Sequence, residues 1–175
     1  MLMNYSITTK NTIYVLKEMI LLSGILLVAL IALYFYIYEE APELFLFITL
    51  LLLIANVGIN ILPVLILYFN YEKVNDGVIL NLAKDRFLVN GKSILLDEIK
   101  SIKTYATHQH FSGQNGAASL TYNDYFYYME VITNNEEKIH LTSLLGYNLD
   151  KDIQKMYPDI RVENVVKSYP IISRS

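Results

Sequence analysis

The chain has 175 residues, of which 54% are apolar and only 18% are charged, and its formal net charge is −3. So apolar a composition lies outside the usual range for a soluble domain of this size. Cysteine is absent, which excludes disulfides and fits a reducing compartment. The slight excess of acidic over basic residues argues against a nucleic-acid partner, because phosphates attract a basic surface.

The apolar residues gather in two runs without charge. The first run lies between Glu18 and Glu39, and the second lies between Glu43 and Glu72. A helix needs about 20 apolar residues to cross the hydrocarbon of a bilayer. The runs therefore predict two membrane spans, at about 19–38 and 44–69. A cleavable signal would have a shorter apolar core followed by a small-residue cleavage site, which these runs do not show.

The segment between the runs, EEAPE, is short enough to predict a tight antiparallel helical hairpin. It carries three carboxylates and no Lys or Arg, whereas Lys10, Lys17 and Lys73 flank the other ends of the two spans. Positive flanks mark the cytoplasmic side of a membrane. We therefore expect a multi-pass protein of the cytoplasmic (inner) membrane with both termini cytoplasmic, and residues 1–18 as a cytoplasmic N-terminal segment.

Two amides interrupt the second run. Asn56 and Asn60 are four residues apart, so they share one face of a helix, where an amide in hydrocarbon needs a partner. One hypothesis is that they line a path for an ion or substrate. The hypothesis we favour is transmembrane packing, with small residues such as Gly58, Ser23 and Gly24 beside them. Two spans without a membrane-embedded acid or base make a poor transporter.

From residue 71 onward polarity alternates with the period of two that is typical of strands. Two hairpins are predicted in 78–95, with a two-residue turn at 84–85 and an Asn-Gly turn at 90–91. These turns keep the apolar side chains on one face. The expected pairs are Leu80 with Val89, Leu82 with Phe87, and Phe87 with Ile94.

A longer strand is predicted from residue 95 to 110, bent near Asp97, although Ile99 and Ile102 differ in parity and leave its buried face ambiguous. After the loop 111–124, the segment 125–144 predicts a hairpin with a three-residue turn at 134–136. The expected pairs are Val131 with Ile139, Met129 with Leu141, and Glu130 with His140. A carboxylate beside an imidazolium favours the charged form, so we expect the pKa of His140 to be raised.

The end of the chain predicts one helix and a short strand. A helix over 148–157 would have Asn148 as its cap and would place Leu149, Ile153 and Met156 on one face. Pro158 should end this helix. The residues 161–166 favour a final strand, and 168–175 form a tail in this prediction.

Three stretches carry a resemblance to a known family: GVILNLAKDRFLVNG, ILLDEIKSI and YYMEVITNNEEKIHLTSLLG, which leads into the helix. Their order resembles bacterial pleckstrin-homology-like (PH-like) domains in small membrane proteins with two N-terminal spans. The resemblance implies an α+β membrane protein, in which a two-helix transmembrane hairpin precedes a mostly antiparallel β PH-like domain at 72–167. It also implies a capping helix near the C-terminus and adaptor or assembly work at a membrane.

The sequence does not nominate a reaction, so we expect no enzyme activity, no catalytic residue and no cofactor. It lacks a cysteine nucleophile, a Gly-x-Ser-x-Gly elbow and a phosphate-binding loop. His108, His110 and His140 are candidate metal ligands, because two of them would share one face of a strand. The interpretation we favour is that they are surface histidines and that no metal binds.

Basic residues in the first hairpins suggest a headgroup-binding patch, since PH domains use a basic pair in a similar place. Acidic residues balance the basic ones over the same domain, which favours an ordinary solvated surface instead. The candidate headgroup-binding residues are Lys84, Arg86, Lys92, Lys100 and Lys103.

The segment TYNDYFYYM is unusually aromatic. Alternation along a strand would place Tyr125 and Tyr127 toward the core and leave Phe126 and Tyr128 exposed. An exposed aromatic cluster is typical of a contact surface. The alternative, which the sequence favours equally, is that a helix, the tail or the bilayer covers the cluster. The candidate partner-binding residues are Phe111, Tyr122, Tyr125, Phe126 and Tyr128.

The leading hypothesis is therefore a membrane-anchored, non-enzymatic binding or adaptor module that docks a membrane protein partner or a second copy of itself. The loop 111–124 is long for a hairpin connection, and we expect it to order against that partner. The alternative is a lipid or small-ligand sensor at the membrane surface. A metal-dependent enzyme that uses the three histidines is the last hypothesis.

Overall fold

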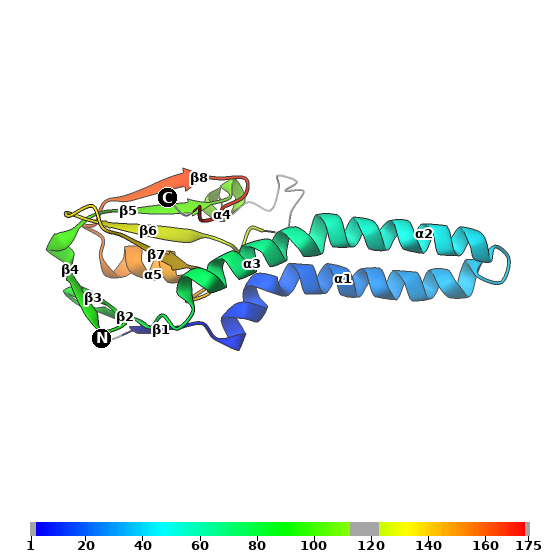
Figure 1. The fold of residues 1–175 in the computed structure, drawn as a ribbon, viewed down its shortest axis with the longest axis horizontal. Coiled ribbons are helices and arrows are strands. Elements are labelled where there is room, and N and C mark those ends of the chain that lie inside the picture. Colours follow the sequence, from blue (N-terminus) through cyan, green and yellow to red (C-terminus); the bar gives the residue numbers. More distant parts are fainter. Residues whose placement is uncertain (1–2, 113–122, 174–175) are drawn as a thin grey trace.

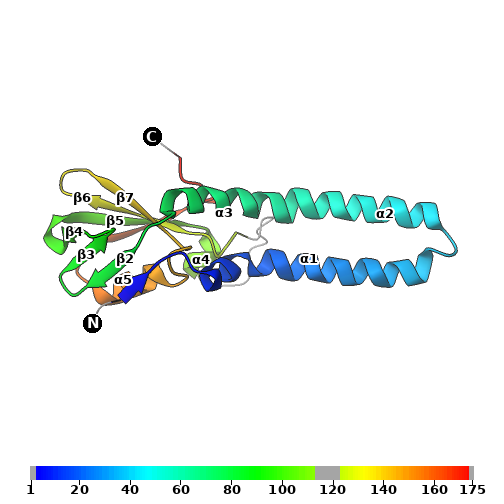
Figure 2. The same ribbon diagram turned by 60° about the horizontal axis from the view of Figure 1, so that its bottom comes forward.

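The computed structural model describes residues 3–112 and 123–173. A long helical hairpin projects from a small domain of two four-stranded sheets (Figures 1 and 2). In chain order the elements are β1 (Met3–Tyr5), α1 (Thr9–Ile37), α2 (Pro42–Ala55), the π-helix η1 (Asn56–Ile61), α3 (Leu62–Asn75), β2 (Leu80–Ala83), β3 (Arg86–Val89), β4 (Lys92–Leu95), the short 3-10 helix η2 (Leu96–Glu98), β5 (Ile99–Ala106), α4 (His108–Ser112), β6 (Tyr128–Thr133), β7 (Lys138–Thr142), α5 (Leu149–Met156) and β8 (Val162–Val166).

The hairpin consists of α1 and of α2, η1 and α3 in one continuous run, and both arms are long and apolar enough to cross a membrane. Thr8 caps α1, because its hydroxyl oxygen accepts the Asn11 N–H at 3.2 Å. Pro42 opens α2 at the first helical position, where no N–H is needed. The predicted antiparallel hairpin is confirmed in the structure, and both arms extend beyond the predicted spans toward the domain (Figure 1).

The second arm contains a π-helical turn just before Pro63. The Leu62 N–H bonds the carbonyl of Val57, five residues back, instead of the carbonyl four residues back. Proline has no N–H and its ring displaces the carbonyl four residues before it, so the chain needs a wider turn at this point. The apolar pattern alone predicted a regular helix here and gave no sign of the change.

Sheet A has the order β1-β2-β3-β4, and sheet B has the order β7-β6-β5-β8 with β8 parallel to β5. The backbones of Asn90 and Gly91 both have positive φ, as the two-residue turn requires, and Glu136 has positive φ in the three-residue turn. All the predicted pairs are confirmed. They are Leu80 with Val89, Leu82 with Phe87, Phe87 with Ile94, Met129 with Leu141, Glu130 with His140 and Val131 with Ile139.

A register shift in β5 resolves the ambiguity between Ile99 and Ile102. The pairing with β6 slips between Ile99 and Ser101, so the extra residue turns both isoleucines to the buried face. The strand ends at Ala106 and the chain continues into α4. The prediction of a strand as far as residue 110 is therefore wrong, and α4 carries His108 and His110.

The N-terminal segment belongs to the domain. β1 pairs with β2 at the edge of sheet A, and the Tyr5 hydroxyl donates to Asp152 Oδ2 at 2.9 Å. Gly146 makes room for this ring, because a Cβ there would lie 2.7 Å from Tyr5 Cδ1. Sheet A therefore includes residues from before the hairpin, whereas the predicted PH-like domain starts at residue 72.

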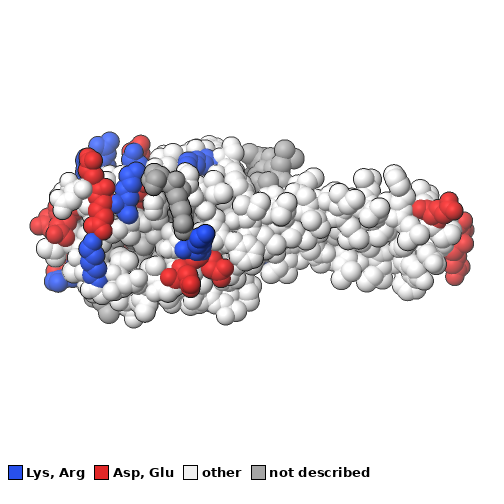
Figure 3. Space-filling view, viewed as in Figure 1, with Lys and Arg blue, Asp and Glu red and all other residues white. Residues whose placement is uncertain are grey.

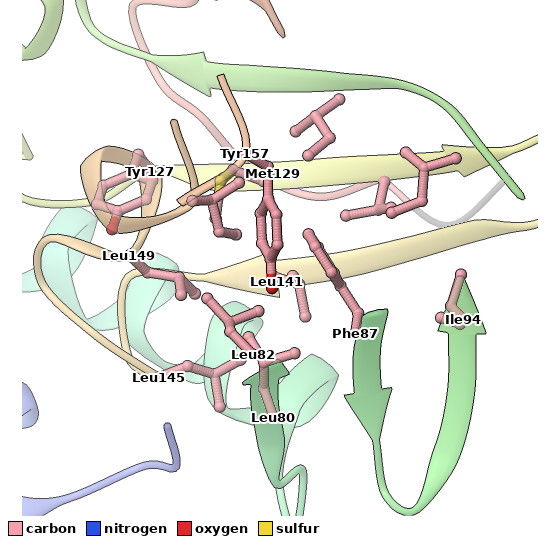
Figure 4. Packing of buried hydrophobic residues seen from close by; sticks show 14 of the residues in the cluster. Leu80, Leu82, Phe87, Ile94, Tyr127, Met129, Leu141, Leu145, Leu149 and Tyr157 are labelled. Atoms are coloured by element: carbon pink, nitrogen blue, oxygen red, sulfur yellow. The ribbon is translucent and has the colours of Figure 1, made fainter. Parts of the chain in front are cut away.

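The main core lies between the two sheets and α5. Leu82 and Phe87 of sheet A face Met129 and Leu141 of sheet B, and Tyr157 at the end of α5 packs on Phe87 (Figure 4). The helix predicted over 148–157 spans Leu149–Met156, and Leu149 and Ile153 are buried as expected. Asn148 precedes the helix but its side chain makes no capping hydrogen bond, so its predicted role as a cap is wrong.

A second core joins the domain to the base of the hairpin. Val64, Leu67 and Tyr71 of α3 are fully buried against the aromatic segment that precedes and begins β6. Phe126 and Tyr128 are 0% and 5% exposed, so the prediction that they lie on the surface is wrong. The reason is the length of the second apolar run, whose last turns cover this face of sheet B.

The predicted tail forms a strap along α3. The Tyr71 hydroxyl donates to the Pro170 carbonyl at 2.7 Å. The Asn70 amide donates to the Ile172 carbonyl at 3.1 Å and accepts the Ile172 N–H at 2.9 Å. Ile172 is buried in the second core. Residues 168–173 therefore help to hold the hairpin on the domain.

Replacing Phe126 tests whether this second core holds the molecule together. Phe126→Ala should lower the free energy of unfolding by about 3–5 kcal/mol, because it leaves a cavity beneath α3. Phe69→Ala is the matched control, since Phe69 lies on α3 with 58% of its surface exposed and should change stability by less than about 0.5 kcal/mol. Denaturation of the detergent-solubilised protein, followed by circular dichroism, measures both. Equal effects would contradict the burial of Phe126.

Candidate functional site

A polar pocket lies where the base of α1 meets α4 and the start of α5, and its volume is about 170 Å³. Three aromatic rings, several carboxylates and amides, a histidine and a lysine surround it. The lining residues are Tyr14, Glu18, Gln109, His110, Asp124, Tyr125, Tyr147, Asn148 and Lys151.

One wall of the pocket is aromatic. Tyr14 packs edge-on against Tyr125 with ring centroids 5.3 Å apart, and its other neighbour is Tyr147, at 4.5 Å. The Lys17 ammonium lies 4.2 Å from the centroid of Tyr14 and 4.1 Å from that of Tyr125. The faces of these two rings therefore already hold one cation.

Two carboxylates face the same space. The Tyr125 hydroxyl donates to Glu18 Oε1 at 3.0 Å, and the Thr107 hydroxyl donates to Asp124 Oδ1 at 2.7 Å. Burial raises the pKa of Tyr125; Lys17 opposes this increase, and the hydrogen bond to Glu18 adds to it. Within residues 3–112 and 123–173, neither Glu18 nor Asp124 forms a salt bridge.

A buried histidine–aspartate pair supports the floor of the pocket. His110 Nε2 lies 2.9 Å from Asp150 Oδ2, and the two side chains are 12% and 8% exposed. Burial by itself would raise the pKa of Asp150, but the hydrogen bond and charge of His110 hold it below the usual value. The Tyr127 ring lies 4.6 Å from His110, and the Tyr127 hydroxyl donates to the Gly146 carbonyl. These contacts fix α4 against α5.

The structure does not assemble the three histidines. His108 is exposed on α4, His110 is paired with Asp150, and His140 lies on β7. Among the described residues no three His, Asp or Glu side chains form a group that could hold a metal ion. The expectation that His108 and His110 share one face of a strand fails because they lie in a helix.

His140 lies in a cluster of charges on the other side of sheet B. Glu130 is 3.6 Å from His140 and 3.2 Å from Lys138, and it accepts a hydrogen bond from Tyr105 at 3.3 Å. The pKa of His140 is lowered, because burial outweighs the opposing charge of Glu130 and Lys138 adds to the decrease. The expectation of a raised pKa was therefore wrong, although the effect of Glu130 has the expected sign.

The candidate headgroup-binding residues are mostly paired with carboxylates. The salt bridges are Arg86 with Asp85 at 2.7 Å, Lys92 with Glu137 at 2.7 Å, Lys100 with Glu136 at 3.7 Å, and Lys103 with Glu163 at 3.7 Å, and Lys84 is exposed. The strands β3 and β4 lie at the end of the domain remote from the hairpin (Figure 1). Figure 3 shows basic and acidic side chains interleaved there. The structure therefore does not form a basic patch at the base of the hairpin from these residues.

The two amides of the second arm contact α1. Asn56 donates to Ser23 Oγ at 3.3 Å, and Asn60 lies within 3.3 Å of Ser23 Oγ and of the Met19 carbonyl. The Asn60 amide also donates to Asn56 Oδ1 at 3.0 Å. These hydrogen bonds join the second arm to α1, as the hypothesis of packing between the helices predicts. Gly58 takes no part, because a Cβ at this position would meet nothing within 4 Å.

Among the candidate partner-binding residues that the structure describes, only Tyr125 lines the pocket. Phe111 packs on the main core, Phe126 and Tyr128 are covered by the hairpin, and Tyr122 lies outside the described residues, as does most of the loop 111–124. Sequence reasoning missed the other lining residues. Tyr14 and Glu18 share one helical face immediately before the first apolar run, and this spacing is the signal that could have found them.

Comparison of the chain with protein-family models, with curated proteins and with solved structures found no match in any of the three. The arguments about function therefore depend on the geometry of this molecule.

The charge cluster on sheet B makes opposite predictions for two substitutions. Glu130→Gln should lower the pKa of His140 further, and Lys138→Gln should raise it. Proton NMR titration of the imidazole measures both shifts. Because the folded pKa lies below the unfolded value of about 6.5, His140 should destabilise the fold as the pH falls through that value, and this loss should be larger in Glu130→Gln. Unchanged titration in both variants would contradict the cluster.

The contacts between the helices predict a modest role for the amides. Replacing Asn56 and Asn60 together by Leu should lower the stability of the hairpin by about 2 kcal/mol, since each hydrogen bond between apolar helices contributes roughly 0.6 kcal/mol. Val57→Leu with Ile59→Leu is the control, because both side chains are exposed on the same arm. Unfolding in sodium dodecyl sulfate measures the difference. Loss of partner binding by a correctly inserted double variant would favour the path hypothesis instead.

Proposed function

We propose that this protein is a membrane-anchored, non-enzymatic binding module whose PH-like domain docks a protein partner at the cytoplasmic face of the inner membrane. The observation that carries the proposal is the division of the hairpin into two parts. Its distal part exposes apolar side chains all round, whereas its base is locked into the core of the domain.

The dimensions of the hairpin support insertion. From Leu44 to Pro63 the second arm rises about 30 Å, which is the thickness of the hydrocarbon core. On α1 the run of exposed apolar side chains starts at Ile20, which is 51% exposed, although Ile13 nearer the start of the helix is also exposed. The face of the hairpin seen in Figure 3 lacks charged side chains until the tip, where the three glutamates of the connecting segment lie. An acidic tip and basic residues near the base favour cytoplasmic termini.

Hydrogen bonds from asparagines fix the orientation of the domain relative to the anchor. The Asn11 amide of α1 donates to the Leu145 carbonyl at 2.9 Å. Asn75, the last residue of α3, donates to the His140 carbonyl at 2.9 Å and accepts the Thr142 N–H at 2.8 Å. These bonds occupy the outer edge of β7, so the helix also protects a strand edge from other chains. A domain held in this way presents the same surface at a fixed distance from the bilayer, which suits an adaptor.

The arrangement of the domain supports the PH-like hypothesis in part. Two sheets enclose the core, and α5 lies against it near one end, as the resemblance implies. Two features depart from that expectation: β1 comes from before the hairpin, and β8 pairs parallel to β5 after α5. The buried pair of His110 and Asp150 joins two helices, so its geometry supports a structural role.

A lipid or small-ligand sensor is the second candidate function. The pocket beside α1 favours it, because a polar cavity at the base of a membrane anchor is accessible to headgroups or to small polar molecules. This candidate shares the anchor and the fixed domain with the first one and differs in what the domain recognises.

Cysteine labelling tests the anchor and its direction. The chain has no cysteine of its own, so single substitutions give a clean signal. An impermeant maleimide should label Ala41→Cys in intact cells, while Asn135→Cys, in the exposed turn after β6, should react only after the membrane is opened. Labelling of Asn135→Cys in intact cells would reverse the orientation and remove the cytoplasmic function.

Isolation in a mild detergent separates docking from sensing. A docking module should purify with a partner at fixed stoichiometry, or as an oligomer whose mass is defined by light scattering. The complex should persist at about 0.5 M salt, because salt at this concentration screens attraction between surface charges. A homogeneous monomer without any partner would contradict docking and leave the sensor as the better function.

A further inference from the structure

We propose that the pocket between α1, α4 and α5 binds the zwitterionic headgroup of a phospholipid with a primary ammonium, of the phosphoethanolamine class. This inference rests on the proposed membrane anchor, and it names a ligand class for the pocket that favours the sensor function.

The position of the pocket selects a headgroup as its ligand. Tyr14 and Glu18 lie on the first turns of α1, between Ile13, which is 55% exposed, and the run of exposed apolar side chains that starts at Ile20. A ligand beside them therefore lies just below the hydrocarbon of the bilayer, at the level of the lipid headgroups. Tyrosines are favoured at this level, because the ring is apolar and the hydroxyl is polar.

The pocket is surrounded by charges of both signs, which fits a zwitterion. Glu18 and Asp124 supply the negative charges, while the positive charges come from Lys151 in the lining, from Lys17 beside Tyr14 and Tyr125, and from Lys10, which lies 5.9 Å from the centroid of Tyr147. His110 is already paired with Asp150 and adds little to this balance. An anionic headgroup would meet both carboxylates without any compensating charge of its own. A zwitterion can place its ammonium near the carboxylates and its phosphate near Lys151.

The aromatic wall distinguishes ethanolamine from choline. A quaternary ammonium is recognised by the open faces of aromatic rings. Lys17 already occupies the faces of Tyr14 and Tyr125, so these rings do not offer a vacant cage. Within residues 3–112 and 123–173, Glu18 accepts a hydrogen bond from Tyr125 and Asp124 accepts one from Thr107, and a carboxylate has about four lone-pair sites in all. A primary ammonium donates three hydrogen bonds, whereas choline donates none from its nitrogen.

The size of the pocket agrees with a short polar group. A cavity of roughly 150 Å³ holds a molecule as large as benzene. The pocket measures about 170 Å³ and is partly open. A phosphoethanolamine group fits this space, and the acyl chains of the lipid would remain outside it.

Binding of short-chain lipids to the delipidated full-length protein tests the proposal. Dihexanoyl phosphatidylethanolamine is titrated in detergent by isothermal calorimetry, beside the phosphatidylcholine and phosphatidylglycerol of the same chain length. We expect the ethanolamine lipid to bind at least ten-fold more tightly than the other two. Equal affinities for the three lipids would overturn the assignment.

Substitutions then locate the site. Glu18→Gln removes the charge but keeps an oxygen that accepts from Tyr125, so the fold should persist and the affinity should fall at least ten-fold. Glu72→Gln is the matched control, because Glu72 accepts a hydrogen bond from Tyr68 at 3.1 Å at the base of the other arm, outside the pocket. It should bind as the wild type does. Lys151→Gln, at an exposed position, gives a second reading and should also weaken binding. Wild-type affinity in both Glu18→Gln and Lys151→Gln would overturn the proposal.

The same headgroup chemistry could come from a membrane lipid or from a soluble zwitterion. Water-soluble glycerophosphoethanolamine, which lacks acyl chains, distinguishes these two ligands. If it binds at least ten-fold more weakly than the lipid, the acyl chains contribute and a membrane lipid is the ligand. Equal affinity would overturn the lipid and assign the pocket to a soluble zwitterion. Every titration is done in detergent, so the lipid affinities do not depend on how the protein lies in a membrane. If the proposed membrane anchor is wrong, the cysteine labelling shows it independently of these affinities.

Discussion

The packing of α3 on the first residues of β6 is the contact on which the rest of the molecule depends. Val64, Leu67 and Tyr71 bury the rings of Phe126 and Tyr128, and each fully buried side chain of this kind contributes roughly 1.5–3 kcal/mol. The second apolar run is longer than a bilayer requires, and its excess length supplies these side chains. The helical hairpin and the domain therefore share this second core.

Asparagine side chains bond several backbone groups at this junction. The Asn75 amide replaces a missing neighbour strand along β7, and Asn70 does the same for the extended strap around Ile172. Such amide-to-backbone pairs require both partners to be correctly placed, because a buried polar group without a partner costs about 1–3 kcal/mol. Apolar packing thus holds the anchor on the domain, and the asparagines determine the angle at which it is held.

Short sequence patterns predicted the features of the fold that depend on residues close together in the chain. The Asn90-Gly91 turn and alternation of polarity were sufficient for the register of the hairpins. They were insufficient where distant segments meet: the pairing of β1 with β2 and the covering of Phe126 depend on contacts across the whole helical hairpin. A strand face that is covered by a remote helix has the same alternation as an exposed face that binds a partner. This is why the aromatic segment was assigned to the surface.

The pocket also depends on contacts between distant segments, which is why the sequence does not predict its lining residues. Glu18, Asp124 and Lys151 come from three segments, and each one alone is typical of an ordinary solvated surface. They converge because the burial of Phe126 brings the adjacent Tyr125 against α1, while His110 and Asp150 hold α4 to α5. The core that joins the anchor to the domain therefore also builds the wall of the candidate site. Recognition at the pocket and the orientation of the domain are consequences of the same contact.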